Sequence, residues 1–387
     1  MLLPWKPLKQ AIIAVIFTFI FSNCFIKGQS THKENQKVTE DPLEELYLLV
    51  SNEHKNHLVH LEKNLYKTGE LQKVFNLMQT GSDAFCNMIY GRKKHDEKVS
   101  DTFIRSDYYK KLHRTHGQYI PKLVAGCRNF FKMNDLNPHR DFELVKKLYP
   151  NASKECYSVG FMQPYLMHQI LGCRKLTMLD IDWKILDGHR QMIQKFKKKE
   201  FANKENVSKN LTSLDIGWIP NFNNEPIQEK EDVSIDTVCF RYYSPYCTQA
   251  LFGFQERFEE LESVQLQLSS LHNGLFIASP GSMVVIFLSN ATDKLYTSWE
   301  EFKLFLDSVY GTLSEGQSAL FIYHNAGRSN FGLYEMKKTS VGKSIETICR
   351  DEYLYPRSYT VQGTYITFFE YITQSKGRNK SCSGMKL

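Results

Sequence analysis

Hydrophobic positions change their spacing along the chain and divide it into regions. Residues 11–21, AIIAVIFTFIF, form an unbroken apolar run, and residues 25–41 after it are polar and aperiodic. From Pro42 to about residue 150, apolar residues recur mostly at steps of three and four, which is typical of helices. Asp41 and Pro42 suit the start of the first helix as N-cap and first helical residue. Further helical blocks are expected at residues 106–133 and 141–148.

From residue 155 onward, short apolar strands alternate with helical segments. The predicted strands are Cys156–Val159, Leu176–Leu179, Ile235–Phe240, Met283–Leu288, Ala319–Tyr323 and Thr364–Tyr371. The predicted helices are Pro164–Leu171, Trp183–Lys198, Gln255–Leu271 and Trp299–Leu313. This alternation predicts an α/β fold, with a mostly parallel sheet covered on both faces and an antiparallel last strand.

The expected organisation has five parts. They are a leader at residues 1–24, a polar tether at 25–41, a helical N-terminal region at 42–150, a Rossmann-like α/β domain at 151–373 and a polar C-terminal tail at 374–387.

The leader indicates export and attachment to a membrane. Lys6 and Lys9 precede the apolar run of residues 11–21, which is too short to span roughly 30 Å of hydrocarbon but suits a signal peptide. The run ends at Phe21-Ser22-Asn23-Cys24, which resembles the lipobox of bacterial lipoproteins, with Phe in the first position as in spirochaete lipoproteins. The resemblance implies that Cys24 becomes the lipid-modified first residue of a protein in the cell envelope. A cleaved secretory signal and a single-pass signal anchor are the alternatives.

Charge does not indicate a nucleic-acid partner. The chain has 49 Lys and Arg against 42 Asp and Glu, a net charge of +7, which is small for 387 residues. Part of this excess lies in one run of lysines, namely Lys195, Lys197, Lys198, Lys199, Lys204 and Lys209. Such a run is most often a solvated helix end, and contact with anionic lipid headgroups is the more specific interpretation.

The cysteines other than Cys24 show no metal-site spacing. They are Cys86, Cys127, Cys156, Cys173, Cys239, Cys247, Cys349 and Cys382. No pair is spaced as C-x-x-C and none lies at zinc-ligand spacing from a histidine, so we predict no metal. Several lie in apolar runs, where the expectation is a buried free thiol, although disulfides would form in an oxidising compartment.

Residues 155–193 carry the most informative arrangement. A strand is followed by a turn at Gly160, a helix, a second strand that ends at Asp180, and a helix from Trp183. In open α/β sheets, ligands bind at the carboxyl ends of the strands, where a glycine permits close approach and a carboxylate can hold ribose hydroxyls.

Over residues 150–373 the chain resembles the class I S-adenosylmethionine-dependent methyltransferases. VGFMQPYLMHQIL stands where that family has its glycine-rich loop, and LTMLDIDWKIL resembles the second strand with its ribose-binding acid. SLDIGWIP resembles the segment that contacts adenine, IDTVCFRYYSP the fourth strand, and SPGSMVVIFL the turn into the fifth. ALFIYHN and GTYITFFEY resemble the closing hairpin. The resemblance implies S-adenosylmethionine as cofactor, with Gly160, Asp180 and Asp215 binding it and Tyr242 and Tyr243 on the substrate side.

The glycine loop departs from the family pattern. After Gly160 it continues with Phe161, Met162, Gln163 and Pro164 in place of further glycines. Side chains there would crowd the methionine and ribose portion of the cofactor.

Other polar residues are expected to have structural roles. Asp182 is predicted to cap the Trp183 helix, and Asp215 has a turn cap as its alternative. His168 and His189 lie on amphipathic helices as ordinary histidines. No Ser-His-Asp order, GxSxG, HExxH or Walker loop is present.

Three functions are compatible with this sequence. The leading hypothesis is a membrane-anchored lipoprotein whose diverged methyltransferase-like domain binds a small molecule or a protein partner at the cell envelope. The alternatives are an active methyltransferase and a surface adhesin that contacts a host. No catalytic residue is predicted.

Overall fold

The computed structural model describes residues 133, 135, 138–214, 235–239, 244–292, 297–324, 330–352, 369 and 381–385. The expectations for residues 1–132, including Cys24 and the leader, lie outside the described residues. Among the described residues, none of the helices has both the length and the apolar character that crossing a membrane requires.

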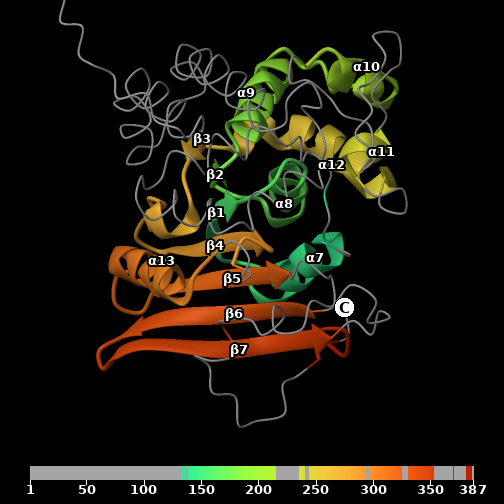
Figure 1. The fold of residues 1–387 in the computed structure, drawn as a ribbon. Coiled ribbons are helices and arrows are strands. Elements are labelled where there is room, and N and C mark those ends of the chain that lie inside the picture. The colour runs from blue at the N-terminus through green and yellow to red at the C-terminus, as the bar shows by residue number, and fades with distance from the viewer. Residues whose placement is uncertain are drawn as a thin grey trace, which may run out of the picture. The chain divides into compact units, whose positions relative to one another are not determined.

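A single seven-stranded sheet organises the described residues (Figure 1). The strands are β1 (Ser153–Ser158), β2 (Lys175–Asp180), β3 (Ser263–Leu268), β4 (Ser282–Ser289), β5 (Ser318–His324), β6 (Asn330–Thr339) and β7 (Gly342–Glu352). Their order in the sheet is β3-β2-β1-β4-β5-β6-β7. The first five strands in this order are parallel, and β6 and β7 are antiparallel to their neighbours. The parallel order 3-2-1-4-5 is that of a Rossmann-like sheet, so the predicted fold class is confirmed.

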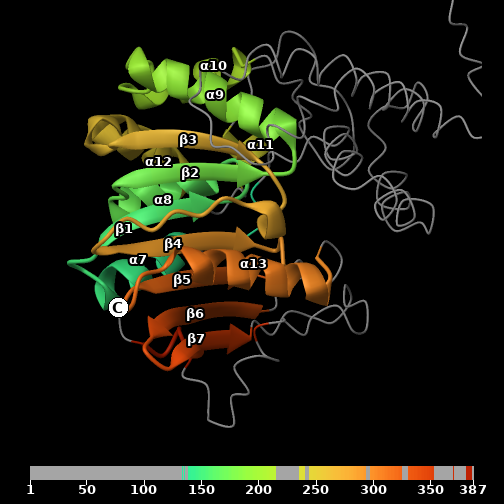
Figure 2. The ribbon, with the colours of Figure 1, turned by 90° about the vertical axis from the view of Figure 1, so that its left-hand side faces the viewer.

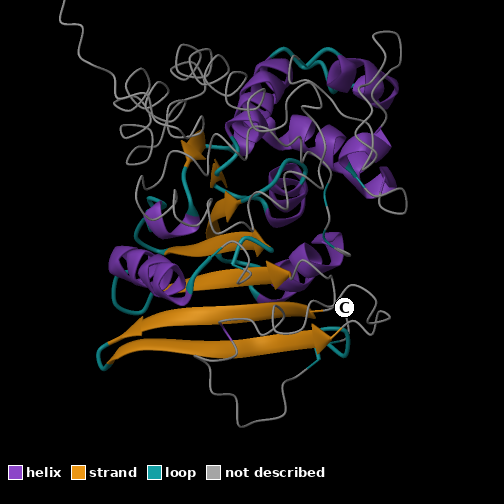
Figure 3. Cartoon of the chain, in the orientation of Figure 1, coloured by secondary structure: helices purple, strands orange, loops and turns teal. Residues whose placement is uncertain are grey.

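Helices cover the two faces of the sheet unequally (Figures 2 and 3). The helices are α7 (Pro138–Leu148), α8 (Gln163–Leu171), α9 (Trp183–Lys197), α10 (Val207–Thr212), α11 (Ile235–Val238), α12 (Ser244–Arg257) and α13 (Trp299–Thr312). Short 3₁₀ turns are η1 (Lys204–Asn206), η3 (Phe258–Glu260) and η4 (Leu271–Asn273). Apolar residues of α7, α8, α9 and α12 form one core with one face of the sheet, and α13 and η4 form the second core with the other face.

Local signals in the sequence account for several helix ends. The Asp182 side chain accepts a hydrogen bond from the Lys184 N–H and caps α9, as predicted. Ser298 and Glu301 form a reciprocal capping box at the start of α13. Gly172 ends α8 in the left-handed conformation with φ of 65°, which a residue with a side chain rarely adopts.

Two predicted elements in the middle of the domain are wrong. Ile235–Phe240 is not a strand, because residues 235–238 form the single turn α11 and the Cys239 N–H bonds to the Ile235 carbonyl. The third strand is instead Ser263–Leu268, inside the segment predicted as helix Gln255–Leu271. That error follows from Leu261, Val264, Leu268 and Leu271, whose steps of three and four imitate a helix.

The closing hairpin also differs from the prediction. β5 pairs with Asn330–Thr339, the next strand in the chain, and SPGSMVVIFL leads into the fourth strand of the chain instead of the fifth. Residues 364–371 lie outside the described residues except Phe369, which is buried and stacks on Tyr334 at 4.5 Å.

Within the part of the chain that the structure describes, three disulfides replace the expected free thiols. They join Cys156 to Cys173, Cys239 to Cys247, and Cys349 to Cys382. Burial in an apolar run was therefore the wrong criterion, because the fold brings together cysteines that are 17, 8 and 33 residues apart in the sequence. The third bond ties residues 381–385, within the predicted polar tail, to β7.

Candidate functional site

The site expected from the fold lies at the carboxyl ends of β1 and β4. β1 has β2 on one side and β4 on the other, so the order of strands reverses between β1 and β4. Ligands of open α/β sheets bind outside the strand ends at such a reversal. Gly160 follows β1, Asp180 ends β2 and Ser289 ends β4, so all three lie at this edge.

The Gly160 peptide is held on both sides. Its N–H donates to Asp180 Oδ2 at 3.0 Å, and its carbonyl oxygen accepts a hydrogen bond from His189 Nε2 at 3.1 Å. The φ angle of Gly160 is +81°, a conformation that explains the glycine. The structure thus brings together Gly160 and Asp180, as predicted, and adds His189.

The Asp180 carboxylate accepts hydrogen bonds from the backbone of Gly160, Ile181 and Asp182. Oδ1 accepts from the Asp182 N–H at 2.9 Å, and Oδ2 accepts from Gly160. Desolvation raises the pKa of Asp180 to about 6, against the lowering effect of its backbone hydrogen bonds. The carboxyl group therefore titrates near pH 6, and its hydrogen bonds organise the loop around it.

His189 is a neutral structural residue. It is 1% exposed, and desolvation lowers its pKa to about 3. Because a carbonyl can only accept, Nε2 carries the proton given to Gly160, and Nδ1 accepts from the Tyr165 hydroxyl at 2.7 Å. His168 is likewise buried, with a pKa lowered to about 4 mainly by desolvation. The prediction that both histidines have structural roles is confirmed.

The residues after Gly160 do not form a glycine cradle. Phe161 and Met162 are buried in the core with α8, α9 and α12. The Gln163 side chain lies over Gly160, since a Cβ added there would meet Gln163 Oε1 at 2.5 Å. Gln163 therefore occupies the space beside the glycine.

A buried polar bridge joins the ends of β1 and β4. Asp135 accepts from Gln163 Nε2 at 2.8 Å and from the Ser289 hydroxyl at 2.7 Å. All three residues are buried, and Ser289 has a φ of +48°, which is unusual for a residue with a side chain. We call these three residues the switch-point bridge. No local pattern predicts this bridge, because Asp135 lies 28 residues from Gln163 and 154 residues from Ser289.

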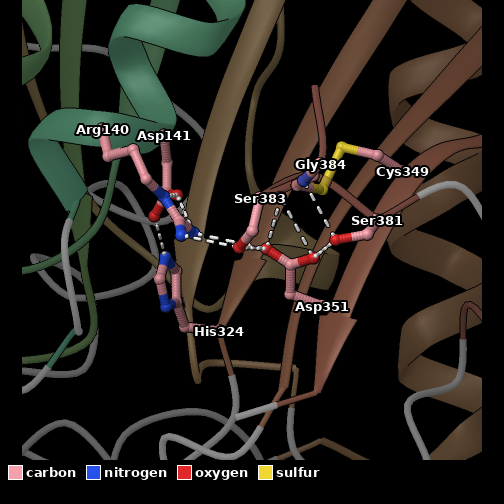
Figure 4. The surroundings of a disulfide bond; sticks show 9 residues. Arg140, Asp141, His324, Cys349, Asp351, Ser381, Ser383 and Gly384 are labelled. Atoms are coloured by element: carbon pink, nitrogen blue, oxygen red, sulfur yellow. Dashed lines mark hydrogen bonds and ion pairs between the residues drawn. A yellow bond between two sulfur atoms is a disulfide. The ribbon is translucent and has the colours of Figure 1, made fainter. Parts of the chain in front are cut away.

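A second buried network lies beside the bridge, at the end of β5 (Figure 4). His324 Nε2 lies 2.8 Å from Asp141 Oδ2, and Arg140 donates to Asp141 Oδ1 at 3.0 Å. Burial alone would lower the pKa of His324, but the hydrogen bond and charge of Asp141, with the charge of Asp135, raise it. Arg140 also reaches Asp351, whose carboxylate accepts from Ser383.

A smaller polar cluster follows β3. Asn273 Nδ2 donates to the Ser270 hydroxyl at 3.2 Å, and His272 Nε2 lies 3.8 Å from Glu301 Oε1 on α13. Ser269, next to it, donates its N–H to the Asp180 carbonyl oxygen, so the cluster adjoins the end of β2. No group of three or more His, Cys, Asp or Glu in the described ranges could hold a metal ion.

The other predicted site residues are not placed. Asp215, Tyr242 and Tyr243 lie outside the described residues. The segment expected as the preceding strand, Ile235–Phe240, contains the helical turn α11, and the place of Tyr242 and Tyr243 on the substrate side stays a prediction. Asp236, expected at the start of that strand, accepts a hydrogen bond from Ser244 at the start of α12.

Comparison with known proteins adds a distant likeness. No protein-family model matches the chain, and no curated protein matches it. A crystal structure of an S-adenosylmethionine-dependent methyltransferase from Clostridium acetobutylicum ATCC 824 matches 64% of this chain and 82% of that chain, at 9% sequence identity and a TM-score of 0.25. A likeness this remote carries no argument about ligand or activity, and the assignment of a Rossmann-like fold rests on the strand order.

Proposed function

We propose that this protein is exported, anchored to a membrane of the cell envelope, and uses its Rossmann-like domain to bind a small molecule or a partner without transferring a methyl group. The switch-point bridge is the observation that supports binding without methyl transfer. At the reversal between β1 and β4, the buried side chains of Gln163 and Ser289 both donate hydrogen bonds to the buried Asp135 carboxylate. This is the place where a Rossmann-like sheet normally receives its ligand.

The residues present do not fit S-adenosylmethionine. The Gly160 N–H already donates to Asp180, and the Gln163 amide lies against the Gly160 Cα. Displacing Gln163 or Ser289 would remove a hydrogen bond from the buried Asp135 carboxylate, which is costly because a buried polar group then loses a partner. No catalytic step is therefore derived through this cofactor.

The disulfides support export. Three bonds within one domain are typical of proteins that fold in an oxidising compartment. They agree with the short apolar leader, and attachment through Cys24 is part of the proposal. S-adenosylmethionine is a cytoplasmic metabolite, which also favours another ligand.

An active methyltransferase is the second candidate. It is favoured by the position of Gly160 beside Asp180, which ends β2 and keeps partial exposure at the strand ends. The switch-point bridge argues against this candidate. The two candidate functions therefore differ in whether the bridge excludes S-adenosylmethionine.

Titration calorimetry with S-adenosylmethionine separates the two candidates. We expect no heat of binding for the whole chain at millimolar ligand, and none for Asp180→Ala. Gln163→Gly, which opens the space over Gly160, is the variant that would gain weak binding if the bridge alone excludes the cofactor. Binding by the unaltered chain that disappears in Asp180→Ala, but persists in the remote control Asp307→Ala, would contradict the proposal and favour the enzyme.

A further inference from the structure

The segment from the end of α9 to α10 is the most basic part of the described surface. Between residues 194 and 212 it has six lysines and two glutamates, a net charge of +4 in a chain of +7. Five of the lysines are exposed and define what we call the basic face, namely Lys197, Lys198, Lys199, Lys204 and Lys209.

Four of the five ammonium groups of this face have no protein partner among the described residues. Among the described residues, Lys197, Lys198, Lys199 and Lys209 make no side-chain hydrogen bond, ion pair or ring contact. Each of the other described lysines makes a hydrogen bond, an ion pair, a ring contact or another electrostatic interaction. Lys204, the fifth member of the face, lies over the Phe252 ring at 5.2 Å. The charge of the face is therefore not neutralised within the described part of the chain.

Stabilisation of the helix dipole explains only part of this arrangement. Lys195 and Lys197 lie in the last turn of α9, where positive charge is favourable. Lys209 lies in the last turn of α10 and Lys198 is the C-cap of α9, so the dipoles of the two helices favour these charges as well. They do not account for Lys199 and Lys204, which lie in the connection between the two helices. The glutamate in the connecting turn, Glu200, is paired with Lys195 at 2.8 Å. Exposed acids in this segment and in the adjoining elements include Glu205 in η1, Glu256 in α12 and Glu259 in η3.

The basic face lies at the opposite edge of the sheet from the candidate site. α9 begins at its Asp182 cap, next to Asp180, and its 15 residues extend about 22 Å at 1.5 Å per residue. At its far end, Phe196 stacks on Phe258, which precedes the start of β3. Figure 2 shows α9 and α10 along this side of the sheet. A surface bound to the basic face therefore leaves the strand ends with Gly160 and Asp180 turned away from it.

We propose that the basic face docks the domain on the anionic lipid headgroups of the membrane to which the chain is attached. This rests on the proposed membrane attachment and specifies how the domain is oriented there. Free ammonium groups complement a layer of phosphate-bearing headgroups, and each lysine near such a surface strengthens binding by roughly fivefold. A tethered domain meets this surface before any dissolved polyanion, which is why lipid is favoured over nucleic acid.

Amine acetylation of the full chain in vesicles tests the orientation. The chain is reconstituted into phosphatidylcholine vesicles with and without phosphatidylglycerol, labelled with an acetylating ester and analysed by mass spectrometry. We expect the basic-face lysines to react at least about threefold more slowly on the anionic vesicles, with protection lost in high salt. Lys303 on α13, near the other edge of the sheet, is the internal reference and should react equally on both.

Charge variants provide the matched control. K197Q/K198Q/K199Q should abolish the protection of Lys204 and Lys209, whereas K303Q/K337Q/K343Q removes the same charge elsewhere and should preserve it. Equal acetylation of a chain that both vesicles retain overturns the docking proposal but leaves the membrane attachment intact. Retention by anionic vesicles alone, lost in the first variant, supports docking and overturns the lipid anchor. Retention of the chain by neither kind of vesicle overturns both the docking and the membrane attachment. Protection of the basic-face lysines by a single-stranded oligonucleotide, with no protection by anionic vesicles, overturns docking on lipid.

Discussion

The peptide group of Gly160 is held on both sides by side chains from β2 and α9. Asp180 holds its N–H and His189 holds its carbonyl, and Tyr165 fixes the histidine tautomer. Of these, the glycine and the aspartate could be predicted, because a strand, a turn glycine and a terminal acid form a short local pattern. His189 could not be assigned its partner, because its contact with Gly160 depends on how α9 packs across the sheet.

The raised pKa of Asp180 predicts a specific effect of pH on stability. A carboxyl whose folded pKa is about 6, above its usual 3.8, contributes stability that is complete at low pH and is lost as pH rises through 6. Asp180→Asn lacks this titration. Its free energy of unfolding relative to the unaltered protein should therefore increase between pH 4 and 7, by on the order of 1–2 kcal/mol given the partial exposure of Asp180.

Urea unfolding at several pH values measures this difference. Subtraction removes the opposite contributions of His168 and His189, whose lowered pKa values make both proteins less stable as pH falls. A difference that stays flat from pH 4 to 7, or that decreases, would show that Asp180 is not desolvated as described.

At the scale of elements, α7 is attached by charge as well as by apolar packing. Asp141 is fully buried and is bonded to both His324 of β5 and Arg140 of its own helix. Removing one member of a buried ionic network leaves the others without compensation.

Asp141→Asn should therefore destabilise the protein by about 3–5 kcal/mol near pH 6. The stability from the raised His324 pKa is complete below pH 6.5 and is lost as pH rises through the folded pKa, so the deficit should shrink at alkaline pH. Chemical denaturation at pH 6 and 9 checks both the size of the deficit and its change with pH.

The exposed pair of Asp307 with Lys343 gives a control, since Asp307→Asn should cost less than about 1 kcal/mol. A cost for Asp141→Asn as small as the control, or the same at both pH values, would argue against a charged network.

Helices whose ends are marked by local sequence signals were predicted well. Strands whose formation depends on pairing with distant segments were not. α8, α9 and α13 agree closely with their predicted ranges because caps and glycine mark their ends. β3 was missed because its leucines fit both a helix and a strand, and only its pairing with β2 decides between them. The pairing of β5 with β6 depends on a connection that residue spacing does not encode.

At the scale of the whole molecule, the Rossmann-like order of strands could be predicted but its closed switch point could not. Alternation of strands and helices restricts the sheet to few arrangements. The bridge joins Asp135, Gln163 and Ser289 only after the sheet has formed, and the disulfides depend on the same assembly. The fold alone therefore does not determine the function of this domain, because internal side-chain contacts occupy the place where other Rossmann-like sheets bind a ligand.

Mass spectrometry of the native protein, isolated from the membrane fraction without reduction, tests the central claim of an exported and anchored domain. We predict a mature polypeptide that begins at an acylated Cys24, with peptides joined through Cys156–Cys173, Cys239–Cys247 and Cys349–Cys382. A polypeptide that starts at Met1 without acyl chains, and has these six thiols reduced, would contradict the account.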